Sequence, residues 1–150
     1  MLRKPGRSTP GGAVRNSTFV DSSAWIAFFS ARDQHHADAD RAFRRTVEAK
    51  RLLLTTNLVL AEIHRLFLYR AGIGAAAVVL DRIEASPMVK IEYAGERHHH
   101  AARIWLKKLS QHPISYADAV SFAVMEATGC KEALSFDHHF RLAGFTQPDH

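Results

Sequence analysis

Apolar and polar residues follow one another along the chain in blocks that predict short strands separated by helices. Runs rich in apolar or β-branched residues, which are typical of buried strands, occur at 18–20, 51–56, 88–91 and 133–136. Between these runs, apolar residues recur with the spacing of amphipathic helices. Because strands that are joined through helices run parallel, this order predicts an α/β fold with a central parallel sheet.

Capping residues and glycines indicate where the helices begin and end. Ser22 or Ser23 is expected to cap a short first helix, and Thr56 or Asn57 is expected to cap a longer one that stops near Gly72. A further helix is expected from Ser115 to Gly129, and the other helical segments lie within 31–50, 74–84, 95–112 and 138–144. In the segment 95–112, an apolar stripe of Ala101, Ile104, Trp105 and Leu109 is expected to face the core.

The composition is that of one soluble globular domain. Apolar residues make up 47% of the 150 residues and charged residues 23%, which is enough for a single core. The lone Cys130 excludes an intramolecular disulfide and is expected to be a small buried residue. The sequence has no signal-peptide pattern and no apolar run long enough to span a bilayer, so a cytoplasmic protein without a membrane partner is expected.

The net charge of +5 is concentrated at one end of the chain. Residues 1–16 hold four basic residues and no acidic one, and they are rich in Gly, Pro and Ser. We interpret them as a disordered basic tail ahead of one domain at 17–150. Without the tail, 16 basic residues stand against 15 acidic ones, so the domain is close to neutral.

Four acidic residues occupy positions that core packing does not explain. Asp21 in FVDSSAW and Asp137 in LSFDHHF follow predicted strands, and Glu62 in LAEI and Asp118 in YADA lie in the first turns of predicted helices. The carboxyl ends of parallel strands share one edge of the sheet, which is where ligands bind in such folds. We therefore expect the four carboxylates to converge at this edge.

Each of the four acids also has a purely structural interpretation. Asp21 and Asp137 can cap helical turns, and Ser115 with Asp118 resembles a capping box. Glu62 is the hardest to explain in this way, because it lies beside the apolar stripe of its helix. Clustered carboxylates repel one another, and a divalent ion such as Mg²⁺ or Mn²⁺, which prefers oxygen ligands, compensates for this repulsion. The four acids together therefore favour a metal site that acts on phosphodiesters.

The order of the motifs VDSSAW, LAEI, YADA and SFDHHF resembles that of PIN-domain ribonucleases, and most closely that of the VapC-type toxins of toxin–antitoxin pairs. The resemblance runs from about Phe19 to the C-terminus. It implies a three-layer α/β/α fold with a central parallel sheet of four or five strands. It also implies a divalent-metal-dependent endoribonuclease.

The resemblance assigns the catalytic quartet to Asp21, Glu62, Asp118 and Asp137. Of these, Asp21, Asp118 and Asp137 are expected to hold the metal ion, Mg²⁺ or Mn²⁺. Glu62 is expected to bind a water or to orient the nucleophile as a general base. Hydrolysis of this kind leaves a 5′-phosphate and a 3′-hydroxyl.

Three further residues are expected to contact the substrate or to support the acids. Ser22 and Ser135 match the small hydroxyl residues that lie beside the site in this family. His139 stands where many members carry a further Asp, although some relatives also have His at that position. This departure leaves open whether one metal ion acts or two.

The expected partners are an RNA substrate, a cognate antitoxin and a second copy of the chain. The apolar segments 66–69 and 75–80 cover more of their helices than one core face needs, which is typical of an interface. Without the four acids, 16 basic residues of the folded part stand against 11 acidic ones, which favours a polyanionic substrate. The consecutive His98, His99 and His100 fan out around a helix and do not favour a zinc site.

Other functions compatible with the residues are a PIN-type nuclease that acts in RNA processing or on DNA, and an inactive PIN module that binds RNA or a partner. The four acids argue against a pure binding module, which has no need of them. A phosphatase of the haloacid-dehalogenase type needs a DxD arrangement, which the DSS of residues 21–23 lacks. The endoribonuclease toxin is the function that the sequence favours.

Overall fold

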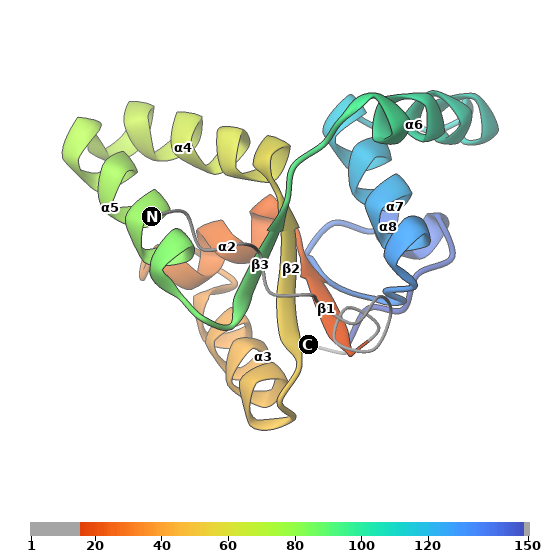
Figure 1. Ribbon diagram of the computed structural model, residues 1–150. Helices are drawn as coiled ribbons and strands as arrows, with labels where there is room; N and C mark the ends of the chain where they lie inside the picture. The colour runs from red at the N-terminus through yellow and green to blue at the C-terminus, as the bar shows by residue number, and fades with distance from the viewer. Residues whose placement is uncertain (1–15, 149–150) are drawn as a thin grey trace, which may run out of the picture.

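A four-stranded parallel sheet lies at the centre of the computed structural model, which describes residues 16–148 (Figure 1). The strands are β1 (Ser17–Val20), β2 (Leu52–Thr56), β3 (Val89–Glu92) and β4 (Glu132–Leu134), in the order β3-β2-β1-β4. Phe19 of β1 lies opposite Leu54 of β2 on one side and Ala133 of β4 on the other. The predicted α/β fold with a parallel sheet is confirmed, and the sheet has four strands.

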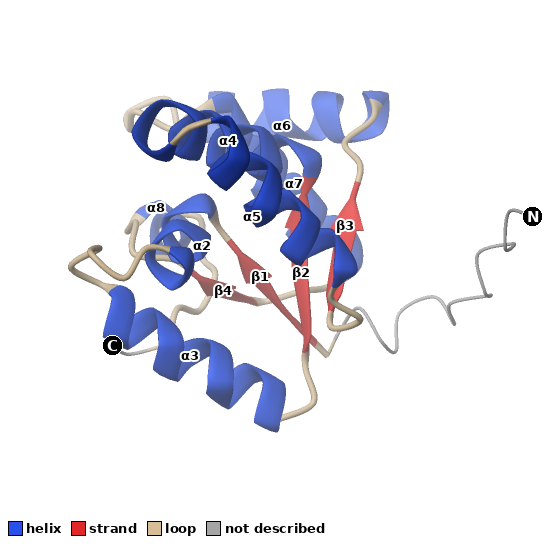
Figure 2. Cartoon of the chain, turned by 90° about the vertical axis from the view of Figure 1, so that its left-hand side faces the viewer, coloured by secondary structure: helices blue, strands red, loops and turns tan. Residues whose placement is uncertain are grey.

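Helices cover both faces of the sheet, as a three-layer α/β/α fold requires (Figures 1 and 2). One face carries α2 (Ser22–Phe29), α3 (His36–Glu48), α4 (Asn57–Ala71) and α5 (Ile73–Ala85). The other carries α6 (Glu96–Lys108), α7 (Tyr116–Thr128) and the short α8 (His139–Leu142). In Figure 1, α4 and α6 extend to either side from the carboxyl ends of the strands, at the top of the view.

The helix caps follow the sequence at four of the five expected places, among them the stop of α4 at Gly72. The side chain of Thr56 accepts a hydrogen bond from the Val59 amide at the start of α4. Ser115 and Asp118 form the expected capping box at the start of α7, and Gly129 closes that helix in the left-handed conformation that favours glycine. The expectation for α2 was wrong, because Asp21 is its N-cap residue and the carbonyl of Asp21 accepts from the Ala24 amide.

Two segments end earlier than the sequence indicated. α6 ends at Lys108 instead of continuing towards Pro113, since the chain turns at Leu109, whose carbonyl accepts from the His112 amide. β4 ends at Leu134 rather than at Phe136, because the Phe136 amide donates to the side chain of Ser23 instead of to a neighbouring strand. This second difference places Asp137 in a loop beyond the strand.

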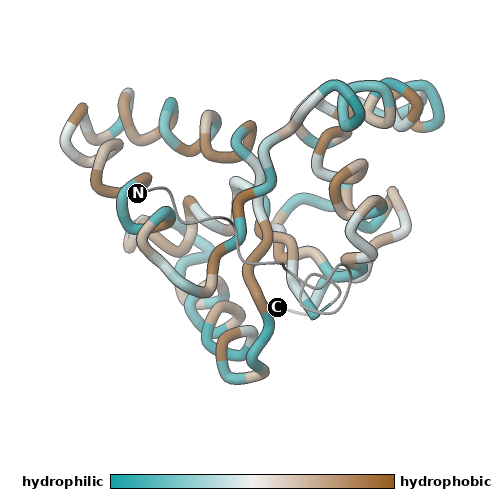
Figure 3. Tube along the Cα trace, viewed as in Figure 1, coloured by the Kyte–Doolittle hydropathy of each residue, from teal (hydrophilic) through white to brown (hydrophobic). Residues whose placement is uncertain are grey.

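The core lies between the strands and the inner faces of the helices. The fully buried rings of Phe19, Phe122 and Phe140 contact one another, with centroids 5.8 Å apart for Phe19 and Phe140 and 5.1 Å apart for Phe122 and Phe140. Cys130 and Trp105 are buried as expected. Ile104 is 69% exposed, so its expected place in the apolar stripe of α6 was wrong. Figure 3 shows a hydrophobic stretch in β2, next to β3, in which hydrophobic and hydrophilic residues alternate.

Among residues 16–148, no helix has the length and the apolar composition needed to span a membrane. The predicted basic tail lies outside the described residues except for Asn16. The boundary of the domain at 17 therefore stays a prediction.

Candidate functional site

Asp21 lies at the centre of the site, directly after β1. It is only 4% exposed, and its backbone amide donates to the carbonyl of Leu134, which fixes it against the end of β4. Its Oδ2 atom accepts hydrogen bonds from the hydroxyls of Ser135, at 3.0 Å, and Ser23, at 3.2 Å. A strand end and two buried hydroxyls therefore hold this carboxylate in one orientation.

Burial and neighbouring charge both make it costly to ionise Asp21. Burial raises its pKa from the ordinary value of 3.8 to about 6, and the nearby carboxylates of Asp118 and Asp137 act in the same direction. Hydrogen bonds from Ser22 and Ser135 oppose the rise without cancelling it. This electrostatic conflict is a direct sign that acids from distant parts of the chain meet here.

Glu62 approaches the same cluster from α4. Its Oε2 atom accepts a hydrogen bond of 3.4 Å from the hydroxyl of Ser22, the residue that follows Asp21. The pKa of Glu62 is raised to about 7, first by desolvation and then by the negative charges of Asp21 and Asp118. The residue as a whole is exposed, so solvent weakens these effects compared with those at the buried Asp21.

Asp118 is both a capping residue of α7 and a member of the acidic cluster. In the capping box its backbone amide donates to the hydroxyl of Ser115 at 3.0 Å, and its Oδ2 atom accepts from the Ser115 amide at 3.4 Å. The same Oδ2 atom lies 3.3 Å from Nδ1 of His139. Its side chain is 13% exposed. The cap therefore positions the carboxylate without removing it from the cluster.

His139 joins the last two acids. Its Nδ1 atom lies 3.0 Å from Oδ2 of Asp137 and 3.3 Å from Oδ2 of Asp118, and its side chain is 14% exposed. Its backbone amide also donates to Oδ1 of Asp137, so the start of α8 fixes both residues together. His139 therefore contacts two carboxylates directly, which the sequence did not predict.

Two residues hold the site together by hydrogen bonds that the sequence did not indicate. Ser23, considered only as a cap, donates to Asp21 and accepts from the Phe136 amide. Gln147 donates from Nε2 to the carbonyls of Ser135, at 3.1 Å, and Asp137, at 2.7 Å, and so fixes the loop after β4. The DSS motif carried a signal for Ser23, whereas nothing near Gln147 in the sequence distinguishes it from a surface residue.

All four predicted acids therefore reach one carboxyl edge of the sheet, together with Ser22, Ser135 and His139. Among the described residues, Asp137, His138 and His139 form a group whose ligand atoms lie within 4.8 Å of one another. His98, His99 and His100 form no such group: each faces a different neighbour, the Gly95 amide, Tyr116 and Glu96 in turn. Crowded carboxylates with one imidazole nitrogen are a donor set suited to a divalent cation.

Comparison with known proteins identifies one family and close relatives. Residues 18–145 match the PIN domain. The chain is 35% identical over 129 residues to the 23S rRNA-specific endonuclease VapC20 of Mycobacterium tuberculosis, in strains CDC 1551 / Oshkosh and H37Rv. This match covers 86% of the chain and 95% of the relative.

A solved structure shares the same arrangement. The crystal structure of Mycobacterium tuberculosis VapC20, described as a sarcin–ricin loop cleaving toxin, superposes with a TM-score of 0.77 at 34% identity. The superposition covers 87% of this chain and 97% of that one. The similarity thus extends over nearly the whole of both molecules.

Proposed function

This chain belongs to the PIN-domain family, and from that membership we propose that it is a divalent-metal-dependent endoribonuclease and the toxin of a toxin–antitoxin pair. The observation that carries the proposal is the meeting of Asp21, Asp118 and Asp137 at one edge of the sheet, where burial first, and then the charges of Asp118 and Asp137, raise the pKa of Asp21 to about 6. Acids brought together at such a cost are typical of a functional site. A stable core needs no such cluster.

The residues of the cluster fit a divalent ion. Asp21, Asp118 and Asp137 supply carboxylate oxygens, and their mutual repulsion is what a cation would relieve. We assign these three residues to the metal site. When bound, the ion supplies Lewis acidity, which activates water and stabilises negative charge on a phosphodiester.

Glu62 is proposed as the general base. Its pKa of about 7 suits a group that takes up a proton near neutral pH. Ser22 donates to its carboxylate and so orients it towards Asp21. Ser135 is proposed to support the acids rather than to bind the ion, because its hydroxyl donates to Asp21 and accepts from the Asp137 amide at 3.0 Å.

The test is cleavage of RNA by the purified chain, shown to be free of antitoxin. With Mg²⁺ or Mn²⁺ we expect endonucleolytic products that carry a 5′-phosphate and a 3′-hydroxyl, and with EDTA we expect none. Single-stranded and duplex DNA of the same sequence serve as controls. Equal cleavage of DNA would support the alternative PIN nuclease, and binding of RNA without cleavage would support the inactive module.

The activity of the relatives suggests the substrate. VapC20 is described as specific for 23S rRNA and as cleaving the sarcin–ricin loop. We propose the same class of substrate for this chain. Incubation with ribosomes, followed by mapping of the ends of all rRNA, tests this proposal: a single cut in that loop supports it, and cuts elsewhere contradict it.

His139 is expected to shift the choice of metal. Its imidazole nitrogen lies within 3.3 Å of two acids that we assign to the ion, and a nitrogen donor favours Mn²⁺ over Mg²⁺. In His139→Asp, which restores an all-oxygen set, we expect the ratio of Mn²⁺ to Mg²⁺ affinity to fall about tenfold. Calorimetric titration of both metals measures the ratio without any enzymatic activity. His138→Asp, on the exposed neighbour, is the control, and an equal change there would contradict the assignment.

Exposed apolar side chains on α4 and α5 support the proposed protein partners. Tyr69 is 77% exposed and Val78 54%, within the segments 66–69 and 75–80 that the sequence singled out, and Ile73, between these segments, is 80% exposed. A groove of 490 Å³ between α2, α3 and α5, lined by Phe28, Phe43 and other apolar residues, is a second such surface. We propose that an antitoxin and a second copy of the chain use these surfaces, and light scattering of the free and complexed chain tests both.

A further inference from the structure

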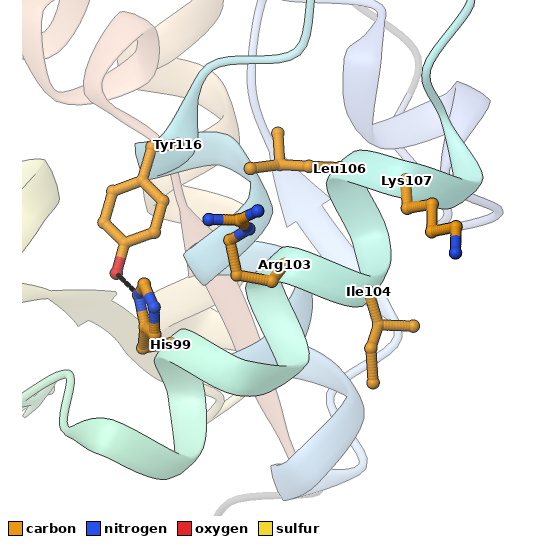
Figure 4. A pocket seen from close by; sticks show the side chains of 6 residues that line it. All are labelled: His99, Arg103, Ile104, Leu106, Lys107 and Tyr116. Atoms are coloured by element: carbon orange, nitrogen blue, oxygen red, sulfur yellow. Dashed lines mark hydrogen bonds between the residues drawn. The ribbon is translucent and has the colours of Figure 1, made fainter.

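An open hollow lies on the outer side of α6, against the first turn of α7 (Figure 4). Its volume is 740 Å³, and the residues that line it are His99, Arg103, Ile104, Leu106, Lys107 and Tyr116. We call it the α6–α7 shelf. We infer that this shelf binds the single-stranded part of the RNA that adjoins the scissile bond, an inference that rests on the proposed function.

The shelf adjoins the acidic site through α7. Tyr116 is the first residue of α7 and Asp118 is the third, so both belong to one helical turn. Residues two apart on a helix point to different sides, and the helix is about 10 Å across with its side chains. A strand cleaved beside Asp118 therefore reaches the shelf within the next few nucleotides, by passing over the start of α7.

The cations of the shelf are available to phosphate. No ion pair of the described residues involves Arg103 or Lys107, and the one acidic residue of α6, Glu96, lies 3.6 Å from His100. On α3, by contrast, Arg41 and Arg44 are paired with Asp38 and Asp40. His99, Arg103 and Lys107 are spaced four residues apart, which forms a row about 12 Å long on the helix.

The shelf also offers an aromatic surface to a base. Tyr116 is 44% exposed, and its hydroxyl lies 2.8 Å from Nδ1 of His99, which holds the ring in place. The two ring centroids are 5.7 Å apart. Figure 4 shows Arg103 extending from α6 towards the side of the shelf where Tyr116 lies. An ordered, exposed ring beside unpaired cations is the combination that binds single-stranded nucleic acid.

Charge favours RNA over a second copy of the chain as the occupant. The exposed Ile104 would suit either partner. A two-fold interface, however, would bury the same patch of both copies together, and the lining of the shelf offers Arg103 and Lys107 no acidic residue to pair with. Phosphates compensate for these charges directly.

The test measures binding of a fluorescent single-stranded RNA in an Asp21→Asn background, in which the RNA stays intact. We expect Arg103→Ala with Lys107→Ala to weaken binding about tenfold at low salt and to reduce the salt slope by about 1.4, as the loss of two phosphate contacts predicts. We expect Tyr116→Ala to weaken binding about tenfold, and Tyr116→Phe, which keeps the ring, to bind within about twofold. The control is Arg45→Ala with Lys131→Ala, which removes the same charge at the start of the strands, on the opposite edge of the sheet.

Two outcomes would overturn the inference. One is equal weakening in the shelf and control variants, which would leave only non-specific attraction. The other is a change in oligomeric state, by light scattering, in the shelf variants or in Ile104→Glu, which would show that a second copy occupies the shelf. If the wild-type chain cleaves RNA while the shelf variants bind RNA as well as the Asp21→Asn background does, the inference about the shelf is wrong and the proposed function stands. If the wild-type chain cleaves no RNA, the proposed function itself is wrong.

Discussion

Asp21→Asn is expected to reduce RNA cleavage roughly 1,000-fold, the scale of loss when a charge that stabilises the transition state is removed. Asp21 is the most buried of the four acids and is central to the cluster, since the pKa values of both Asp21 and Glu62 depend on the charge of the other acids. Asparagine keeps the shape of the side chain and an oxygen that can accept from Ser23 and Ser135. What it removes is the negative charge that we assign to metal binding.

The stability of the variant separates a chemical effect from misfolding. At neutral pH the substitution removes a buried charge, so Asp21→Asn is expected to unfold at the same or a higher denaturant concentration than the wild-type chain in EDTA. Circular dichroism during urea unfolding measures this. Asp81→Asn, on the exposed surface of α5, is the matched control and is expected to cleave RNA like the wild-type chain. Cleavage by Asp21→Asn within tenfold of wild type would contradict the assignment of Asp21.

Local sequence signals were sufficient where one segment determines its own structure. The four strands, the Thr56 and Ser115 caps and the stop at Gly129 all depend on residues that lie next to one another in the chain. The sequence was also sufficient to predict the convergence of Asp21, Glu62, Asp118 and Asp137. In a parallel sheet, strand ends and the helix starts that follow them lie at the same edge.

Contacts between distant segments could not be predicted from the sequence in the same way. His139 looked like a residue that contacts substrate or supports the site, and only the packing of α8 against α7 shows its nitrogen beside both Asp118 and Asp137. Ile104 has the spacing of a core residue on α6, yet α7 covers a different side of that helix. Gln147 supports the acidic loop through two backbone carbonyls that no local pattern connects to it.

The stability of the metal-free chain is expected to fall as pH rises from about 4 to 7, because of Asp21. The unfolded chain loses the Asp21 proton near pH 3.8, whereas the folded chain keeps it until about pH 6. Between these values the folded state binds more protons, so each step up in pH favours unfolding. The difference between the two pKa values corresponds to a loss on the order of 3 kcal/mol, complete above about pH 6. Glu62, whose pKa is raised to about 7, acts in the same direction.

Because other groups titrate over the same range, the measured quantity is the difference in unfolding free energy between the wild-type chain and Asp21→Asn. In EDTA, this difference is expected to shift against the wild-type chain as pH rises from 4 to 7, since the variant has no carboxylate at this position to ionise. Saturating Mn²⁺ is expected to reverse the shift above pH 6, because the ion binds the ionised acids of the folded chain alone. A difference that stays constant with pH in EDTA would mean that Asp21 ionises as freely as it does in water. The crowding of carboxylates on which the metal assignment depends would then be absent.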